Sequence, residues 1–127
     1  MTKKTIQTDN APAAIGIYSQ AVQAGNLLFI SGQIPLVPET MEMVSDEFEA
    51  QAIQCFTNLK AVCEAAGSSL DKSVKVNISM TDLSNFVTVN RVMERFFDQP
   101  YPARAAVGVA QLPKDALIEI EAIIDLS

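Results

Sequence analysis

Polar and apolar residues alternate over several short segments of this chain, which is the pattern of β-strands buried on one face. The clearest segment spans residues 73–80, where one face is apolar and the other polar. The apolar face consists of Val74, Val76, Ile78 and Met80. Segments 19–24 and 27–33 flank Gly25-Asn26, a pair typical of a tight hairpin turn. These segments predict an early hairpin and a separate strand in the middle of the chain.

Two other segments show the three- and four-residue spacing of amphipathic helices. The first follows Ser45, a candidate N-cap, and stops at Gly67, which suits the left-handed conformation that ends many helices. Its apolar stripe is Phe48, Ala52, Cys55, Phe56, Leu59, Val62, Cys63 and Ala66. The second runs from about Ser84 to Phe97. Its apolar face includes Asn90, and a buried amide there needs a hydrogen-bond partner.

The last third of the chain is interpreted as a pair of neighbouring strands joined by a short loop, at 101–110 and 117–124. With the period of two, Arg104 shares its face with Ala106, Gly108 and Ala110, so a cation stands among small residues. That arrangement leaves room for a small anionic ligand. Glu119 and Glu121 share one face of the final strand, and we expect Glu119 to lie on the face of Arg104. An ion pair between Arg104 and either glutamate is the alternative that spacing leaves open.

With a short edge strand at 4–8, the element order is β-β-β-α-β-α-β-β. This order predicts an α+β fold in one domain, residues 1–127, with a mixed sheet of about six strands and two helices on one face. The other face mixes polar and apolar side chains, and we expect it to contact other copies in a closed ring. The side chains expected there are Lys75, Asn77, Ser79, Arg104, Leu117, Glu119, Glu121 and Ile123.

Composition narrows the function. The net charge of −6 opposes binding to nucleic acid and to anionic membrane surfaces. The first residues have no apolar core of a signal peptide, so we expect a soluble, cytoplasmic protein. Histidine is absent, which makes a metal site improbable and leaves Ser31 without the base that a serine hydrolase needs. Cys55 and Cys63 lie roughly 12 Å apart on one helix, too far for a disulfide.

A set of short motifs occurs in a specific order along almost the whole chain. The motifs are Ala11-Pro12-Ala13-Ala14-Ile15-Gly16-Ile17-Tyr18-Ser19-Gln20-Ala21, Ser31-Gly32-Gln33, Asn90, Tyr101-Pro102-Ala103-Arg104, Leu112-Pro113-Lys114 and Ile118-Glu119-Ile120-Glu121-Ala122. Together they resemble the RidA family, also called YjgF. The resemblance implies a chorismate-mutase-like fold and homotrimers with a cleft between each pair of subunits.

The activity that the resemblance implies is hydrolysis of reactive enamines and imines, such as 2-aminoacrylate and 2-aminocrotonate, to 2-oxo acids and ammonia. Pyridoxal-phosphate dehydratases release these intermediates, and the deaminase itself requires no cofactor. By motif match, Arg104 would bind the substrate carboxylate and Glu119 would hold or activate water. The pocket would be lined by Tyr18, Ser31, Gly32, Asn90 and the backbone at Ala106.

Two positions depart from the pattern of the family, and other interpretations stay open. Ile17 stands where the family usually has proline, and Ala106 where many members have cysteine. Tyr18 could be a buried core phenol, and Asn90 a structural amide within its helix. A protein that binds 2-oxo or amino acids without turnover is the first alternative function. An endoribonuclease or translation inhibitor is the second, and the acidic charge and the absence of histidine disfavour it.

Overall fold

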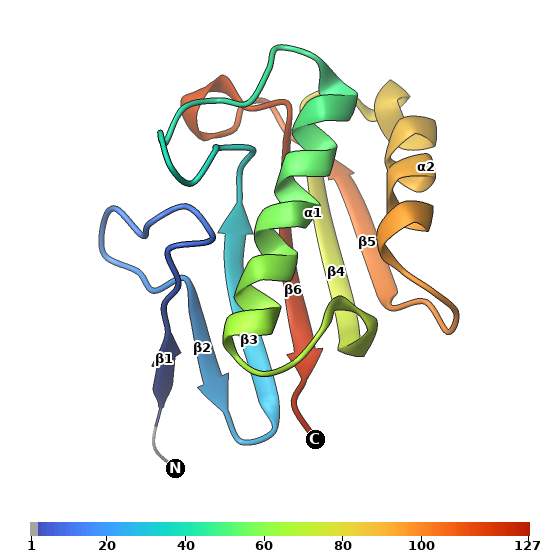
Figure 1. Ribbon diagram of the computed structural model, residues 1–127. Coiled ribbons are helices and arrows are strands. Elements are labelled where there is room, and N and C mark those ends of the chain that lie inside the picture. The colour runs from blue at the N-terminus through green and yellow to red at the C-terminus, as the bar shows by residue number, and fades with distance from the viewer. Residues whose placement is uncertain (1–2) are drawn as a thin grey trace.

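One six-stranded mixed sheet carries two helices on a single face in the computed structural model, which describes residues 3–127 (Figure 1). The strands are β1 (Lys4–Ile6), β2 (Ala21–Ala24), β3 (Leu27–Gln33), β4 (Ser73–Met80), β5 (Ala103–Gly108) and β6 (Ile118–Asp125). The helices are α1 (Phe48–Ala65) and α2 (Phe86–Phe96), with 3₁₀ turns at Leu70–Lys72, Leu83–Asn85 and Pro113–Asp115. The predicted α+β class and the order of elements are confirmed.

The strand order across the sheet is β1-β2-β3-β6-β4-β5. All neighbouring strands are antiparallel except β4 and β5, which are parallel. The chain leaves β4, crosses the sheet face as α2 and returns in the same direction as β5, as parallel neighbours require. The prediction that β5 and β6 form one strand pair is therefore wrong, because β4 lies between them.

The core lies between the sheet and the two helices. Val76, Ile78 and Met80 of β4 are buried there, as their alternation predicts. Val74 is an exception at 47% exposed, because a register shift between Ser73 and Lys75 interrupts the ladder. On the helix side, the fully buried ring of Phe56 stacks on Phe96, with ring centroids 5.5 Å apart, and meets the edge of Phe97.

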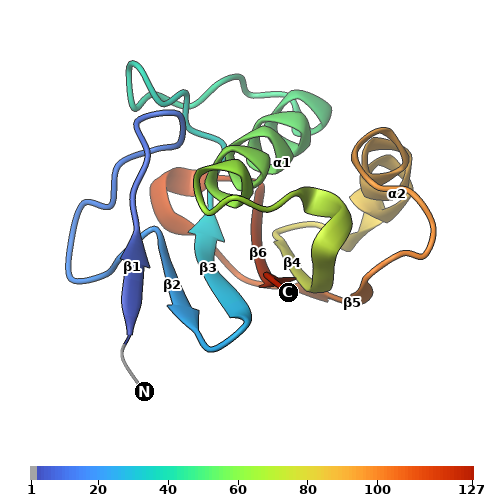
Figure 2. The same ribbon diagram turned by 60° about the horizontal axis from the view of Figure 1, so that its bottom comes forward.

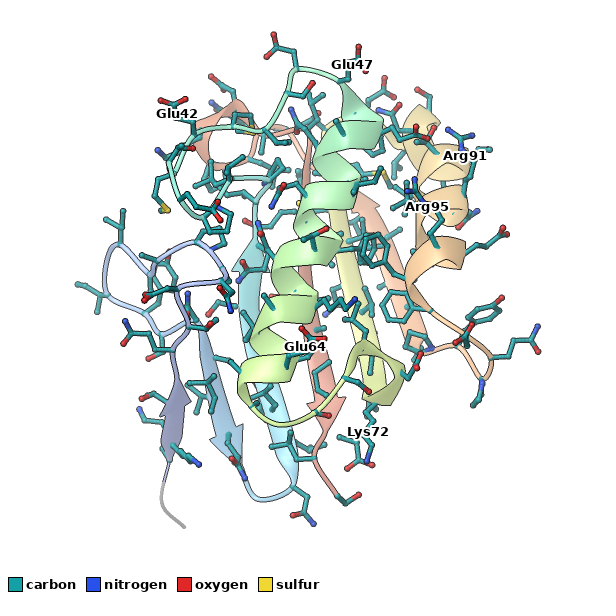
Figure 3. All side chains as sticks on the ribbon, viewed as in Figure 1. Glu42, Glu47, Glu64, Lys72, Arg91 and Arg95 are labelled. Atoms are coloured by element: carbon teal, nitrogen blue, oxygen red, sulfur yellow. The ribbon has the colours of Figure 1, made fainter. Side chains whose placement is uncertain are left out.

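The ends of α1 test the predicted caps. Gly67 follows the helix with φ +79°, so the predicted left-handed stop is confirmed. Ser45 is not the N-cap, because the helix begins two residues later than predicted and Glu47 takes the cap position (Figure 3). The Ser45 hydroxyl instead accepts the Glu47 N–H at 3.0 Å, in the turn that precedes the helix. The second helix also begins late, at Phe86 after the 3₁₀ turn.

Both cysteines of the chain lie buried on α1 as free thiols. Burial raises the pKa of the Cys55 thiol well above its ordinary value and raises that of Cys63 to about 12. Within residues 3–127, no helix is both long enough and apolar enough to cross a membrane.

In the part of the chain that the structure describes, no layer covers the face of the sheet opposite the helices (Figure 2). Strand register places Phe29 and Val107 on this face, where they are 43% and 50% exposed. Polar groups stand beside them: Asn77 donates a hydrogen bond to Glu121 at 3.2 Å, from β4 to β6. The predicted mixture of polar and apolar side chains on this face is confirmed, with one important change at Arg104.

Candidate functional site

Arg104 lies on the helix-covered side of the sheet. It pairs with Val76 in the parallel β4–β5 ladder, and paired residues point to the same face. Glu119 pairs with Ser79 on the alternate face, which the helices leave uncovered. The prediction that Arg104 and Glu119 share a face is therefore wrong. The period of two was applied correctly within each strand, but the assumed β5–β6 pairing set the wrong phase between them.

The Arg104 guanidinium is held by α2. Nη1 donates to Asn90 Oδ1 at 2.6 Å and lies 3.5 Å from Met93 Sδ, while Cζ stands 4.8 Å from the centre of the Phe86 ring. This answers the question that the sequence raised about Asn90, whose partner is Arg104. Neither Glu119 nor Glu121 lies within ion-pair distance of Arg104, so the ion-pair alternative is wrong.

The guanidinium borders a cavity of about 340 Å³. Asn90, Met93, Glu94, Tyr101, Pro102 and Arg104 line it. In the described chain, every hydrogen bond that the guanidinium donates comes from Nη1. Because the group carries five N–H donors, the Nε and Nη2 donors remain for a ligand carboxylate.

Ala106 is half-buried on β5, the last strand of the sheet, and its methyl group packs against the core. The N–H of Val109 bonds to the Met80 carbonyl of β4 at 2.8 Å. Since alternate residues of an edge strand point their N–H groups inward and outward, the Ala106 N–H points away from β4, along the open edge. The backbone at Ala106 can therefore donate to a ligand or a neighbouring chain, whichever side chain stands there.

Glu119 faces a second cavity, of about 460 Å³, on the other side of the sheet. Its walls are Pro12, Ala13, Ile15, Tyr18, Gln20, Gly32, Gln33, Ile34, Leu36, Met41, Pro113, Lys114 and Glu119. Burial raises the pKa of the half-buried Glu119 carboxyl above its ordinary value, and the charge of nearby Glu121 adds to the rise. A carboxyl with such a pKa in a cavity is a candidate for proton transfer.

Gly32 and Glu119 are in direct contact. A Cβ built on Gly32 would lie 2.7 Å from the Glu119 Cδ, closer than a real methyl group can come. Glycine therefore lets the Glu119 side chain lie across the backbone of β3. Ser31 and Gly32 coincide with a register shift against β6, which opens the ladder at this point.

Ser31 and Tyr18 have different roles from each other. The Ser31 hydroxyl donates to the Ser19 carbonyl at 2.6 Å, which ties the strand to the preceding loop. Tyr18 is 54% exposed at the cavity wall, so the alternative of a buried core phenol is wrong. Ile17 beside it is fully exposed, and its side chain does not line the cavity.

Sequence reasoning missed two residues at this cavity. Lys114 is the one cation among its lining residues and comes from the turn Pro113–Asp115. Gln20 is buried, and its Nε2 donates to the carbonyls of Pro12 at 2.8 Å and Thr8 at 3.0 Å. A proline-containing loop with few ladder partners was the available signal, since its buried carbonyls need donors.

Two separate groups of residues thus carry the candidate chemistry. The arginine half-site consists of Asn90, Arg104 and the Ala106 backbone at the β5 edge. The glutamate half-site consists of Tyr18, Gly32 and Glu119 on the uncovered side. The exposed ion pair of Arg91, which Figure 3 labels on α2, with Glu49 of α1 lies outside both half-sites.

Known proteins of one family match this chain over nearly its whole length. The family model described as Endoribonuclease L-PSP matches residues 8–125. The RutC family protein y4sK of Sinorhizobium fredii is 51% identical over 122 residues, which are 96% of this chain and 97% of that protein. The 2-iminobutanoate/2-iminopropanoate deaminase of Escherichia coli is 51% identical over 123 residues, covering 94% of this chain and 95% of its own.

Solved structures of similar proteins have the same fold as this chain. RidA from the Antarctic bacterium Psychrobacter has a TM-score of 0.93 at 57% identity, over 96% of this chain and 98% of its own. E. coli TdcF with bound serine has a TM-score of 0.93 at 45% identity, over 98% and 99% of the two chains. The chain therefore belongs to the RidA family, also called YjgF, whose family model carries the description Endoribonuclease L-PSP.

Proposed function

We propose that this protein hydrolyses small reactive enamines and imines, of the 2-aminoacrylate and 2-aminocrotonate type, to 2-oxo acids and ammonia. The observation that carries the proposal is the pair of half-sites, one suited to a carboxylate and one to a water molecule, on opposite faces of one chain. The names of relatives at 50–51% identity point to the same reaction class. The physiological role would be removal of by-products of pyridoxal-phosphate dehydratases.

In this proposal Arg104 binds the substrate carboxylate. Its free Nε and Nη2 donors match the two carboxylate oxygens in a fork geometry that lysine cannot reproduce. Asn90 fixes the guanidinium through Nη1, and the outward Ala106 N–H adds a donor that the departure from cysteine does not remove. A carboxylate fixed in this way holds the imine carbon at a defined point.

Glu119 positions the hydrolytic water. A proton first adds to the terminal carbon of the enamine, which gives the iminium form of the 2-imino acid. Water then attacks the C2 carbon while the Glu119 carboxylate accepts a hydrogen bond from it and takes one of its protons, which gives the carbinolamine. Glu119 returns this proton to the nitrogen, the C–N bond breaks as the C=O bond forms, and ammonia leaves with the hydroxyl proton as ammonium. Tyr18 and Gly32 shape the wall around that water.

The two half-sites meet only if a second copy joins them. We propose a homotrimer in which the uncovered sheet face packs against a neighbour and the β5 edge of one subunit meets the Glu119 cavity of the next. Exposed apolar side chains on that face, such as Phe29 and Val107, support such burial. Each site would then take Arg104 from one subunit and Glu119 from another.

The test is acceleration of 2-oxo acid formation. A serine dehydratase generates 2-aminoacrylate, and the rate of pyruvate formation is followed with and without the purified protein. Arg104→Ala should abolish the acceleration, because the carboxylate loses its fork of donors. Arg91→Ala is the matched control: it removes an exposed arginine of α2 that lines neither cavity, and the acceleration should persist. No acceleration by the wild-type protein would refute the proposal.

Calorimetry separates catalysis from binding alone. Titration with 2-oxobutanoate measures whether the site takes the product class and whether Arg104→Ala removes the affinity. Binding that depends on Arg104 together with no turnover would establish the first alternative, a protein that binds 2-oxo acids without changing them.

A further inference from the structure

The buried polar side chains of residues 3–127 are all carboxamides. They are Gln20, Gln33, Gln51 and Asn58. Gln20 and Gln33 line the cavity of the glutamate half-site themselves. From α1, on the opposite face of the sheet, Asn58 bonds to the Leu36 carbonyl in the cavity wall, and Gln51 bonds to the Leu117 N–H, two residues before Glu119. Burying an amide on an otherwise apolar helix face costs free energy unless the amide is hydrogen-bonded. The backbone groups that bond to these amides therefore show which segments the amides hold in place.

Gln51 links α1 to Leu117, the residue immediately before β6. Its side chain is 2% exposed, and its Oε1 accepts the Leu117 N–H at 2.8 Å, while its Nε2 donates to the Ser45 carbonyl at 2.9 Å. The Leu117 carbonyl accepts from the Thr81 N–H at 3.2 Å. Both backbone groups of Leu117 are therefore fixed, and Leu117 stands two residues before Glu119.

Asn58 makes an equivalent link seven residues further along the same helix face. Its Nδ2 donates to the Leu36 carbonyl at 3.0 Å and lies 3.4 Å from that of Ile34, and its Oδ1 accepts from Gln54 at 2.8 Å. Ile34 and Leu36 also line this cavity, on the segment that follows β3. The two amides thus hold two different segments: Asn58 holds the segment that follows β3, and Gln51 holds the residue that leads into the strand of Glu119.

We propose that Gln51 is a positioning residue for Glu119, which it places by fixing the Leu117 N–H immediately before β6. The inference rests on the proposed role of Glu119 as the water-positioning carboxylate. The space around Glu119 makes its position sensitive, because its Cδ lies directly over Gly32 with no room for a methyl group between them. A small displacement of β6 relative to β3 moves the carboxylate out of this contact and toward solvent.

The charged and titratable groups around Glu119 determine how its titration reports that displacement. Glu121 shares its strand, Lys114 and Tyr18 line the same cavity, and Cys55 lies behind the sheet with Sγ 3.7 Å from the Ile118 carbonyl. Gln51 carries no charge and is not one of these groups, so its replacement changes none of the charges around Glu119. A change in the titration of Glu119 on mutation of Gln51 therefore reports a change in its burial and contacts.

The experiment compares Gln51→Met with Asn58→Leu, two nearly isosteric changes that each remove one buried amide from α1. In Gln51→Met, kcat should fall on the order of ten- to a hundred-fold, as expected for a misplaced reacting group, with KM changed by less than about twofold. In Asn58→Leu, KM should rise and kcat should stay near that of the wild type. Carbon NMR of the Glu119 carboxyl should show its pKa moved toward the ordinary value in Gln51→Met alone.

Two outcomes would overturn the inference: an equal loss of kcat in both variants, or an unchanged Glu119 titration in Gln51→Met. Replacing Leu117 by its α-hydroxy acid removes the same N–H without altering α1, so it provides the test if Gln51→Met does not fold. The NMR titration needs no turnover. A wild-type protein without deaminase activity would refute the proposed function, while the titration would still decide whether Gln51 positions Glu119.

Discussion

Mixing two inactive variants would show whether Arg104 and Glu119 act together across subunits. Arg104→Ala disables the arginine half-site, and Glu119→Gln disables the glutamate half-site on the opposite face of the sheet. Each variant alone should lack deaminase activity. In a mixed ring, a site that takes Arg104 from a Glu119→Gln subunit and Glu119 from an Arg104→Ala subunit has both functional groups.

The expected recovery follows from counting. With equal amounts and random assembly, half of the arginine half-sites and half of the glutamate half-sites are intact, so about one quarter of all sites are complete. The fraction does not depend on the number of subunits, because each site takes one contribution from each of two neighbours. The recovered activity should therefore approach about one quarter of that of the wild type.

The assay refolds the two variants together from denaturant and measures pyruvate formation from 2-aminoacrylate. Each variant refolded alone gives the background, and refolded wild-type protein gives the recovery of the procedure. Native mass spectrometry reports whether mixed oligomers have formed. Background activity in a sample that contains mixed oligomers would refute a shared site, because complementation is then absent although the partners are present.

Three further changes test the geometry within each half-site. Gly32→Ala should lower kcat at least about ten-fold with the fold retained, because the new methyl group displaces the Glu119 carboxylate. Steady-state kinetics and thermal unfolding test this together, and an unchanged kcat would contradict the contact. Asn90→Leu should raise KM about ten-fold with kcat nearly constant, because Arg104 keeps its charge but loses a hydrogen bond that orients it; steady-state kinetics decide, and a loss confined to kcat would argue against a binding role. Because burial raises the pKa of Glu119, activity should fall on acidification with a midpoint above the usual glutamate range, and Glu119→Gln should remove that limb from any residual activity. The folded state holds this proton more tightly than the unfolded chain does, so ionised Glu119 destabilises the fold at high pH, and the stability returns as the pH falls through the folded pKa. Urea unfolding across this range should show this gain on acidification in the wild type but not in Glu119→Gln, and parallel stability curves would refute it.

Local patterns predicted the elements well because each depends on neighbouring residues. The alternation at 73–80 gave the bounds of β4, and Gly67 correctly marked the end of α1. Val74 and Ser45 show the limit, since a bulge and a delayed helix start depend on contacts with distant strands. The motifs indicated the RidA family, but the residue pattern does not show which strands are neighbours in the sheet.

The relation between Arg104 and Glu119 could not be predicted from alternation. A period of two fixes the side chains within a strand, but the phase between strands depends on which strands pair. Insertion of β4 between β5 and β6 placed the two residues on opposite faces. Gln51 was missed for a related reason, because its hydrogen-bond partner is the backbone of a residue 66 positions away. The one available signal was a polar residue beside the apolar stripe of the helix.

The two cysteines give this protein an internal probe of its own motions. Both lie on α1 with closed surroundings and pKa values raised by burial, so an alkylating reagent meets no reactive thiolate in the folded state. Labelling then requires that the helix lift from the sheet. The rate of native-state alkylation therefore measures how often the layer that supports the Glu119 strand opens, without any engineered label.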